Sequence, residues 1–146
     1  MIGEKLRYHG VALARLVQDS GTALSIRARK ETSHCAYAIN DDRIIFVKYA
    51  TSRISPWRFG FSAEQRNELD ELYAEFPPTW IVLVCGGEGV LTIPWSVVLA
   101  DLLKENDEGA FSLQASRKRG EKFRLSGARD APLLISENDF PSSVLS

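Results

Sequence analysis

A lysine at the end of an apolar run is the first group in the chain that could do chemistry. Lys48 follows the apolar residues 44–47 and precedes Tyr49, so a strand would carry its ammonium group to the edge of a sheet. An ammonium group in that place can bind a phosphate or an acidic partner. The alternative is that the side chain only extends along the strand end to reach solvent.

Basic and aromatic residues follow Lys48 at the spacing of an extended chain, since three rings at 57, 59 and 61 alternate with residues 58 and 60. Such rings can stack nucleic-acid bases while arginines hold phosphates. The alternative is that the rings close the core between a strand and the following helix. A basic turn at 117–119 would add outlying phosphate contacts. The expected binding residues are Lys48, Arg53, Trp57, Arg58, Arg117, Lys118 and Arg119.

The composition is that of an ordinary globular protein, and we expect a single domain over residues 1–146. The net charge of −1 divides into +5 for residues 1–61, −8 for 62–109 and +2 for 110–146. A basic face built from the first third is therefore one interpretation, and solvated surface charge is the other. No apolar run approaches the ~20 residues that cross a bilayer, so we expect no membrane span and a cytoplasmic location.

Hydrophobic periodicity predicts the elements that position these groups. A helix is expected over residues 4–19, with Leu6, His9, Leu13, Leu16 and Val17 on its inner side. Strands are expected at 22–30, 34–39 and 43–49, the last two joined by a turn at 40–42. The strand 43–49 is apolar on both faces, which is typical of a central strand covered by helices on each side.

The second half of the chain predicts a helix, two strands, a further helix and a hairpin. Ser62 with Gln65 three residues later forms a capping box, which predicts that a helix begins there and ends before Pro77. Pro94 suits the first position of the next helix. Beyond Gly127 the pattern fades, and we expect the last few residues to be loosely held. The remaining expected elements are strands at 80–85 and 90–93 and a hairpin of 111–115 with 122–125.

Other reactive residues point to structural roles. Cys35 and Cys85 lie in apolar runs and are expected to be buried free thiols. His9 is expected to be a core histidine, because two separated histidines with few further ligands do not suit a zinc site. The glycine-rich residues 86–89 lead into a strand, which favours a hairpin turn over a phosphate-binding loop. No Gly-x-Ser-x-Gly elbow is present, so no catalytic nucleophile is expected.

The order helix, three strands, helix and strand over residues 4–85 resembles the PD-(D/E)XK, or restriction-endonuclease-like, fold, in the manner of small archaeal Holliday-junction resolvases. The segments around Lys48 and Trp57 also resemble those of small uncharacterised bacterial proteins. The resemblance implies an α/β fold with a mixed central sheet flanked by helices. Its core would be α-β-β-β-α-β over about 4–85, followed by a β-α-β-β extension over about 86–127 and a tail over about 128–146.

Enzymes of that family hold a divalent metal between an aspartate on the second strand and the glutamate of Glu-x-Lys on the third, because Mg²⁺ prefers carboxylate oxygens. Here Lys48 matches the lysine, but the glutamate position is Phe46. If the turn centres on Asp41 and Asp42, Tyr37 pairs with Phe46 and takes the aspartate position. Glu4 could stand for an assisting acid of the first helix. No metal ligand, catalytic residue or cofactor is therefore expected.

These features favour a catalytically inactive nuclease-like domain that binds nucleic acid or a partner that handles nucleic acid. The first alternative is a divergent nuclease that uses Mg²⁺, Glu4 and an unrecognised acid. The second alternative is a protein-interaction or self-associating module, for which the contiguous aromatic residues and the acidic helix at 62–76 are the indications. The oligomeric state is not indicated by the sequence.

Overall fold

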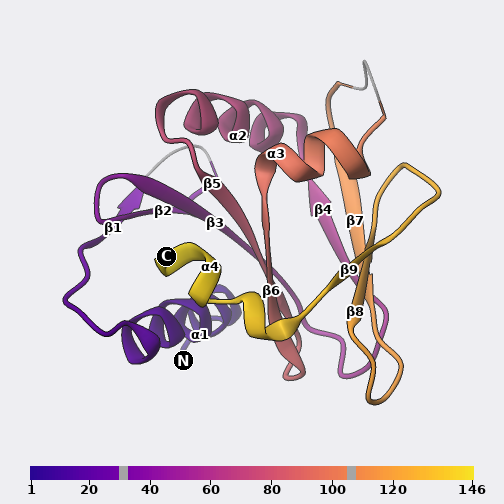
Figure 1. The fold of residues 1–146 in the computed structure, drawn as a ribbon, viewed down its shortest axis with the longest axis horizontal. Helices are drawn as coiled ribbons and strands as arrows, with labels where there is room; N and C mark the ends of the chain where they lie inside the picture. The colour runs from indigo at the N-terminus through magenta and orange to yellow at the C-terminus, as the bar shows by residue number, and fades with distance from the viewer. Residues whose placement is uncertain (30–32, 105–107) are drawn as a thin grey trace.

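The computed structural model describes residues 1–29, 33–104 and 108–146, which form two sheets with helices packed against them (Figure 1). Sheet A has the spatial order β1 (Ile26–Arg29), β2 (Ala36–Ile39), β3 (Arg43–Ala50), β5 (Thr79–Cys85) and β6 (Gly89–Pro94). Sheet B has the order β4 (Trp57–Phe61), β7 (Phe111–Ser116), β8 (Phe123–Ser126) and β9 (Leu133–Ile135). The strands β3 and β5 are parallel and the other paired strands are antiparallel, so sheet A is mixed.

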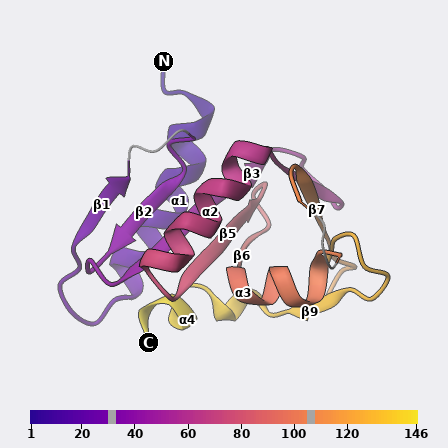
Figure 2. The same cartoon turned by 90° about the horizontal axis from the view of Figure 1, so that it is seen from above.

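Helices cover both faces of sheet A (Figures 1 and 2). On one face lie α1 (Glu4–Asp19) and α4 (Ser142–Leu145), which pack against the odd-numbered residues of β3. On the other face lie α2 (Ala63–Glu75), α3 (Trp95–Val97) and the π-helical turn η1 (Val98–Leu102) that continues α3. Since β3 is covered on both sides, residues 44–47 are fully buried, as their uninterrupted apolar character predicts.

This architecture confirms the predicted fold class. The order α1, β1, β2, β3, α2 and β5 is the expected α-β-β-β-α-β core, with a mixed central sheet between helices. The expected extension is present as β6, α3, β7 and β8. Within the residues described, no helix has the length and apolar character needed to cross a bilayer.

The second sheet is a finding that the sequence did not predict. The strand β4 lies between β3 and α2 in the chain, yet it pairs with β7 some fifty residues later. Its inward rings Trp57, Phe59 and Phe61 are at most 2% exposed. Trp57 was one of the rings that could either stack bases or close the core, and the structure places it in the core: its ring is buried against Phe123 and its Nε1 donates to the Ser52 carbonyl at 2.8 Å.

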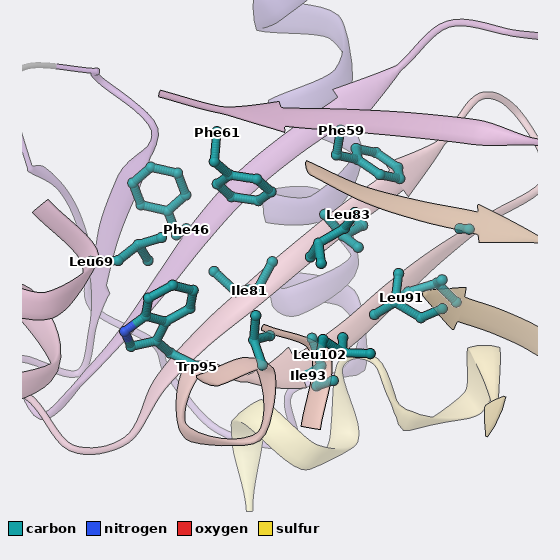
Figure 3. Packing of buried hydrophobic residues seen from close by; sticks show 14 of the residues in the cluster. Phe46, Phe59, Phe61, Leu69, Ile81, Leu83, Leu91, Ile93, Trp95 and Leu102 are labelled. Carbon is teal, nitrogen blue, oxygen red and sulfur yellow. The ribbon is translucent and has the colours of Figure 1, made fainter. Parts of the chain in front are cut away.

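A column of aromatic rings joins the two sheets (Figure 3). Phe61 of sheet B lies 6.2 Å from Phe46 of sheet A and stacks on Phe111 at 4.5 Å between ring centroids. Trp95 continues the column at 5.6 Å from Phe111, and its Nε1 donates to Asp70 at 3.0 Å. Large buried rings in offset contact contribute strongly to a core, so this column holds sheet B against α2 and sheet A.

The register of the β2–β3 hairpin differs by one residue from the prediction. Ile39 pairs with Arg43, so the loop has three residues and centres on Asp41. Asn40 and Asp41 both have positive φ angles, of 53° and 57°, which these residue types tolerate better than most. As a result Phe46 pairs with Ala36 instead of Tyr37, and the expected aromatic pair of Tyr37 with Phe46 does not form.

The chain ends differ from the predictions in detail. The first helix is confirmed, but Leu6 and Val17 are 68% and 60% exposed, and Ala12 takes a buried place instead. The strand expected over 22–30 is formed by Ile26–Arg29, and its expected last residue lies outside the described residues. The C-terminal segment was expected to be loosely held. Instead it forms β9, the short helix η2 (Glu137–Asp139) and α4, because Phe140 and Val144 are buried against sheet A.

Candidate nucleic-acid interface

A pocket of about 400 Å³ surrounds Lys48 where β3 approaches its C-terminal end. The elements that form it are the first half of α1, the segment before β2, the end of β3 and the start of α2. Its floor is Cys35 and Val47, which are buried. Its lining also includes the side chains of Lys5, His9, Ser33, Tyr49 and Gln65. Figure 2 shows the N-terminal halves of α1 and α2 on either side of this end of the sheet.

Lys48 sits at the inner side of the pocket with neutral partners. Its Nζ donates to Gln65 Oε1 at 3.2 Å and lies 5.2 Å from the centroid of the Phe61 ring. Burial lowers the pKa of Lys48; the nearby Cys35 raises it, and the positive charge of Lys5 lowers it further. The Lys48 side chain is half-buried. It therefore does not simply extend along the strand end into solvent, which was the alternative interpretation.

His9 is the buried member of the site. Its ring is 2% exposed, and its Nδ1 shares a 2.7 Å hydrogen bond with the Tyr37 hydroxyl, which confirms the predicted core histidine. Burial lowers the pKa of His9 to about 4, and the positive charges of Lys5 and Lys48 act in the same direction. The imidazole is therefore neutral at pH 7.

Tyr49 forms an aromatic wall of the pocket. The ring of Tyr8 stacks on it with 4.9 Å between centroids and 6° between planes. Burial, the negative charge of Glu4 and a hydrogen bond to Glu4 all raise the pKa of Tyr49. Glu4 was the expected substitute acid, and the structure places it beside this hydroxyl.

Glu68 is a further acid near the pocket, and no sequence pattern singled it out. It belongs to the acidic helix at 62–76, yet it is 6% exposed. Its carboxylate accepts from the Ser33 hydroxyl at 2.8 and 2.9 Å and from the Ser33 amide at 3.3 Å. Glu64, Glu71 and Glu75 of the same helix are exposed along a groove that Arg29 also lines.

The position expected for a metal-binding glutamate is part of the core. Phe46 is fully buried, and Figure 3 shows its ring between Phe61 and Leu69. Tyr37 lies on the opposite side of sheet A, with α1. The parts of the chain that the structure describes contain no group of three or more His, Cys, Asp or Glu side chains that could hold a metal ion.

Several other predicted binding residues lie away from Lys48. Arg117 packs its guanidinium 4.3 Å from the Phe123 centroid and pairs with Glu88 at 3.3 Å and Glu137 at 3.6 Å. It therefore braces sheet B against the β5–β6 turn. Arg119 shares a pocket of about 380 Å³ with Arg117 and Glu88.

The remaining predicted residues are exposed and dispersed. Arg53 lies beside Glu88 and Gly87 in an open depression. Arg58 points outward from β4, opposite Gln114 of β7, and Lys118 is exposed in the turn after β7. The structure thus does not gather the predicted basic residues into one cluster around Lys48.

The two cysteines behave as predicted. Cys35 and Cys85 are free and buried. Burial raises the pKa of the Cys85 thiol to about 12, and the nearby Arg117 opposes this only in part. Cys85 is therefore an unreactive core residue. The Cys35 thiol donates to the Ser33 carbonyl at 3.4 Å and faces the pocket around Lys48.

The sequence matches no protein-family model, and no curated protein matches it. Among solved structures, the chain is similar to Hjc, a Holliday junction resolvase from the hyperthermophilic archaeon Archaeoglobus fulgidus. That similarity has a TM-score of 0.48 and 13% sequence identity, and it covers 75% of this chain and 83% of the other.

The class of fold is defined by the chain's own strand order and helix placement. It is an α/β fold whose α-β-β-β-α-β core has a mixed sheet between helices, with sheet B beside it. Within that core, Lys48 occupies the end of the third strand, and the pocket around it is the candidate functional site.

Proposed function

We propose that the protein is a catalytically inactive nuclease-like domain that binds nucleic acid through the pocket around Lys48. The observation that carries the proposal is that two lysines, Lys48 and Lys5, line the same pocket. Both line it, and the positive charge of Lys5 lowers the pKa of Lys48. Two ammonium groups facing one space attract a phosphate, and Tyr49 offers a ring for stacking beside them.

One observation supports the absence of catalysis: a buried core residue, Phe46, stands at the position where the metal-binding glutamate was expected. Phe46 is fully buried in the aromatic column, so it cannot be exchanged for a carboxylate without disturbing the packing between the sheets. Glu4 and Glu68 do not line the pocket; each interacts with a neutral side chain that does, Tyr49 and Ser33 respectively.

A binding titration over a range of salt concentrations tests the proposal. Phosphate-dominated binding must weaken steeply with salt, with a slope of about −0.7 per phosphate contact for single strands. We expect the variants Lys48→Ala and Lys5→Ala to weaken binding of a labelled strand, since both lysines line the pocket. Glu71→Ala, an exposed acid of α2, is the control and should bind at least as well as the wild type. Weak binding at low salt, or an affinity that does not change in Lys48→Ala, would contradict the proposal.

The alternative of a divergent nuclease keeps one specific observation in its favour. Glu4 interacts with Tyr49 and Glu68 with Ser33, two residues that line the Lys48 pocket, and a carboxylate is a ligand that Mg²⁺ prefers. Branched, single-stranded and double-stranded substrates incubated with Mg²⁺ or Mn²⁺ decide between the two. We expect no cleavage beyond that of a Lys48→Ala control. Cleavage that Lys48→Ala, Glu4→Gln or Glu68→Gln abolishes would establish the nuclease instead.

A further inference from the structure

Among the residues that the structure describes, no acid forms an ion pair with either lysine of the pocket. Lys5 Nζ donates to the Ser33 carbonyl at 3.1 Å, and Lys48 Nζ donates to Gln65 Oε1 at 3.2 Å. Both acceptors are neutral. Within residues 1–29, 33–104 and 108–146, neither ammonium group forms an ion pair, so the pocket presents about two positive charges to a ligand.

The two lysines of the pocket repel each other. Burial lowers the pKa of Lys48, the nearby Cys35 raises it, and the positive charge of Lys5 lowers it. Burial and the positive charges of both lysines lower the pKa of His9. Glu4 acts on the hydroxyl of Tyr49, while the Glu68 carboxylate is bound by Ser33. A bound anion would therefore relieve the repulsion between the lysines and the cost of burying Lys48.

Gln65 can supply a neutral donor beside Lys48. Gln65 Oε1 accepts from both the Ser62 amide at 3.0 Å and Lys48 Nζ. This fixes the amide plane, and the Gln65 Nε2 keeps both of its N–H groups free of any acceptor in the described part of the chain. Gln65 thus completes the capping box at the start of α2 and also lines the pocket. Its amide N–H groups add neutral donors to the two ammonium groups of the lysines.

The floor and the wall limit what can enter. Cys35 and Val47 are buried at the floor, so the pocket is closed at that end and a nucleic-acid strand cannot pass through it. Tyr49, backed by Tyr8, offers the face of a fixed ring at the side. A volume of about 400 Å³ lies within the range of small-ligand sites.

We propose that this pocket binds the terminal phosphate monoester of a nucleic-acid strand. The phosphoryl group lies between Lys5 and Lys48, and the first base lies against Tyr49. A monoester carries a charge of about −1.5 to −2 at pH 7, close to that of the two lysines, whereas an internal diester carries −1. The inference rests on the proposed function, since it names the part of the nucleic acid that the same site takes.

The test compares labelled single strands of one sequence that carry a 5′-phosphate, a 3′-phosphate or no terminal phosphate. We expect a phosphate at one of the two ends to tighten binding by about tenfold or more, because a charge-assisted contact contributes ~1.5–3 kcal/mol. The variants Lys5→Met and Lys48→Met should each remove most of that preference. Lys104→Met, an exposed lysine outside the pocket, should keep it.

The outcomes separate this inference from the proposed function. Equal affinity for all three strands, with binding intact, overturns the inference alone, as does a preference that survives in the Lys5→Met and Lys48→Met double variant. Failure of every strand to bind overturns the proposed function as well. Inorganic phosphate and a free nucleoside monophosphate are added as competitors. Competition by either with the same affinity as the phosphorylated strand assigns the pocket to a small ligand and also overturns the inference.

Discussion

The buried histidine of the pocket makes stability depend on pH in a defined window. His9 has a pKa of about 4 in the folded protein, because it is buried and faces Lys5 and Lys48. The unfolded chain has an ordinary histidine pKa of about 6.5. Between these values the unfolded state binds a proton that the folded state does not. The contribution of His9 to stability is therefore complete above pH ~6.5 and is lost as the pH falls towards 4.

The magnitude follows from the difference in pKa. Each unit corresponds to about 1.36 kcal/mol, so lowering the pH from 7.5 to 5 removes about 2 kcal/mol from the free energy of unfolding through His9 alone. Urea unfolding at the two pH values measures the loss. Carboxyl groups contribute to the same change, so the variant His9→Gln, which does not titrate, is measured in parallel.

The expected result is a smaller pH-dependent loss in His9→Gln than in the wild type, by about 2 kcal/mol. An NMR titration of the His9 ring gives the folded pKa directly. If both proteins lose the same stability, or if the ring titrates near 6.5, His9 is solvated and its description as a buried member of the pocket is wrong. Tyr37, which shares the hydrogen bond with His9, ionises far above this range and does not contribute.

Three further substitutions, and one control at Gly60, test the turn, packing and helix-cap features of the fold. Gly86→Ala should destabilise by about 2–3 kcal/mol in urea unfolding, since φ is +52° and a Cβ would meet the Ser52 carbonyl. Gly60→Ala has open space around its Cβ and should not destabilise. Arg117→Ala should cost about 1–2 kcal/mol, from the lost ring contact and two partly exposed ion pairs, without weakening oligonucleotide binding at 25 °C. Ser62→Ala should lower stability by about 1 kcal/mol through loss of the cap, and an unchanged unfolding midpoint would contradict the capping box.

Local signals in the sequence predicted the elements well. The uninterrupted apolar residues 44–47 predicted a doubly covered strand, and Ser62 with Gln65 predicted where α2 begins. Sheet B was not predictable in the same way, because β4 and β7 are joined only by pairing across about fifty residues. The hairpin register depended on whether two or three residues turn, and the residue types at 40–42 suit both.

Of the residues that line the site, the sequence predicted only Lys48 as a binding residue, and it did not identify the residues around it. Lys48 was identified from its place at a strand end, but Lys5 and His9 come from a helix far away in the chain. Their separation of four residues on one side of α1 is the signal that could have found them. Glu68 lies in a helix rich in acids, and its burial and its hydrogen bonds with Ser33 depend on tertiary packing that the sequence pattern does not reveal.

The central claim is that the pocket around Lys48 receives the phosphate of a nucleic acid. A ¹H–¹⁵N NMR titration of the labelled protein with a short phosphorylated single strand tests this most directly, since it reports where the ligand lies. The account predicts that the largest shifts fall on the backbone amides of Lys5, Ser33, Lys48, Tyr49 and Gln65. Shifts confined to the outward face of sheet B, around Arg58 and Arg124, or no shifts at millimolar strand, would contradict it.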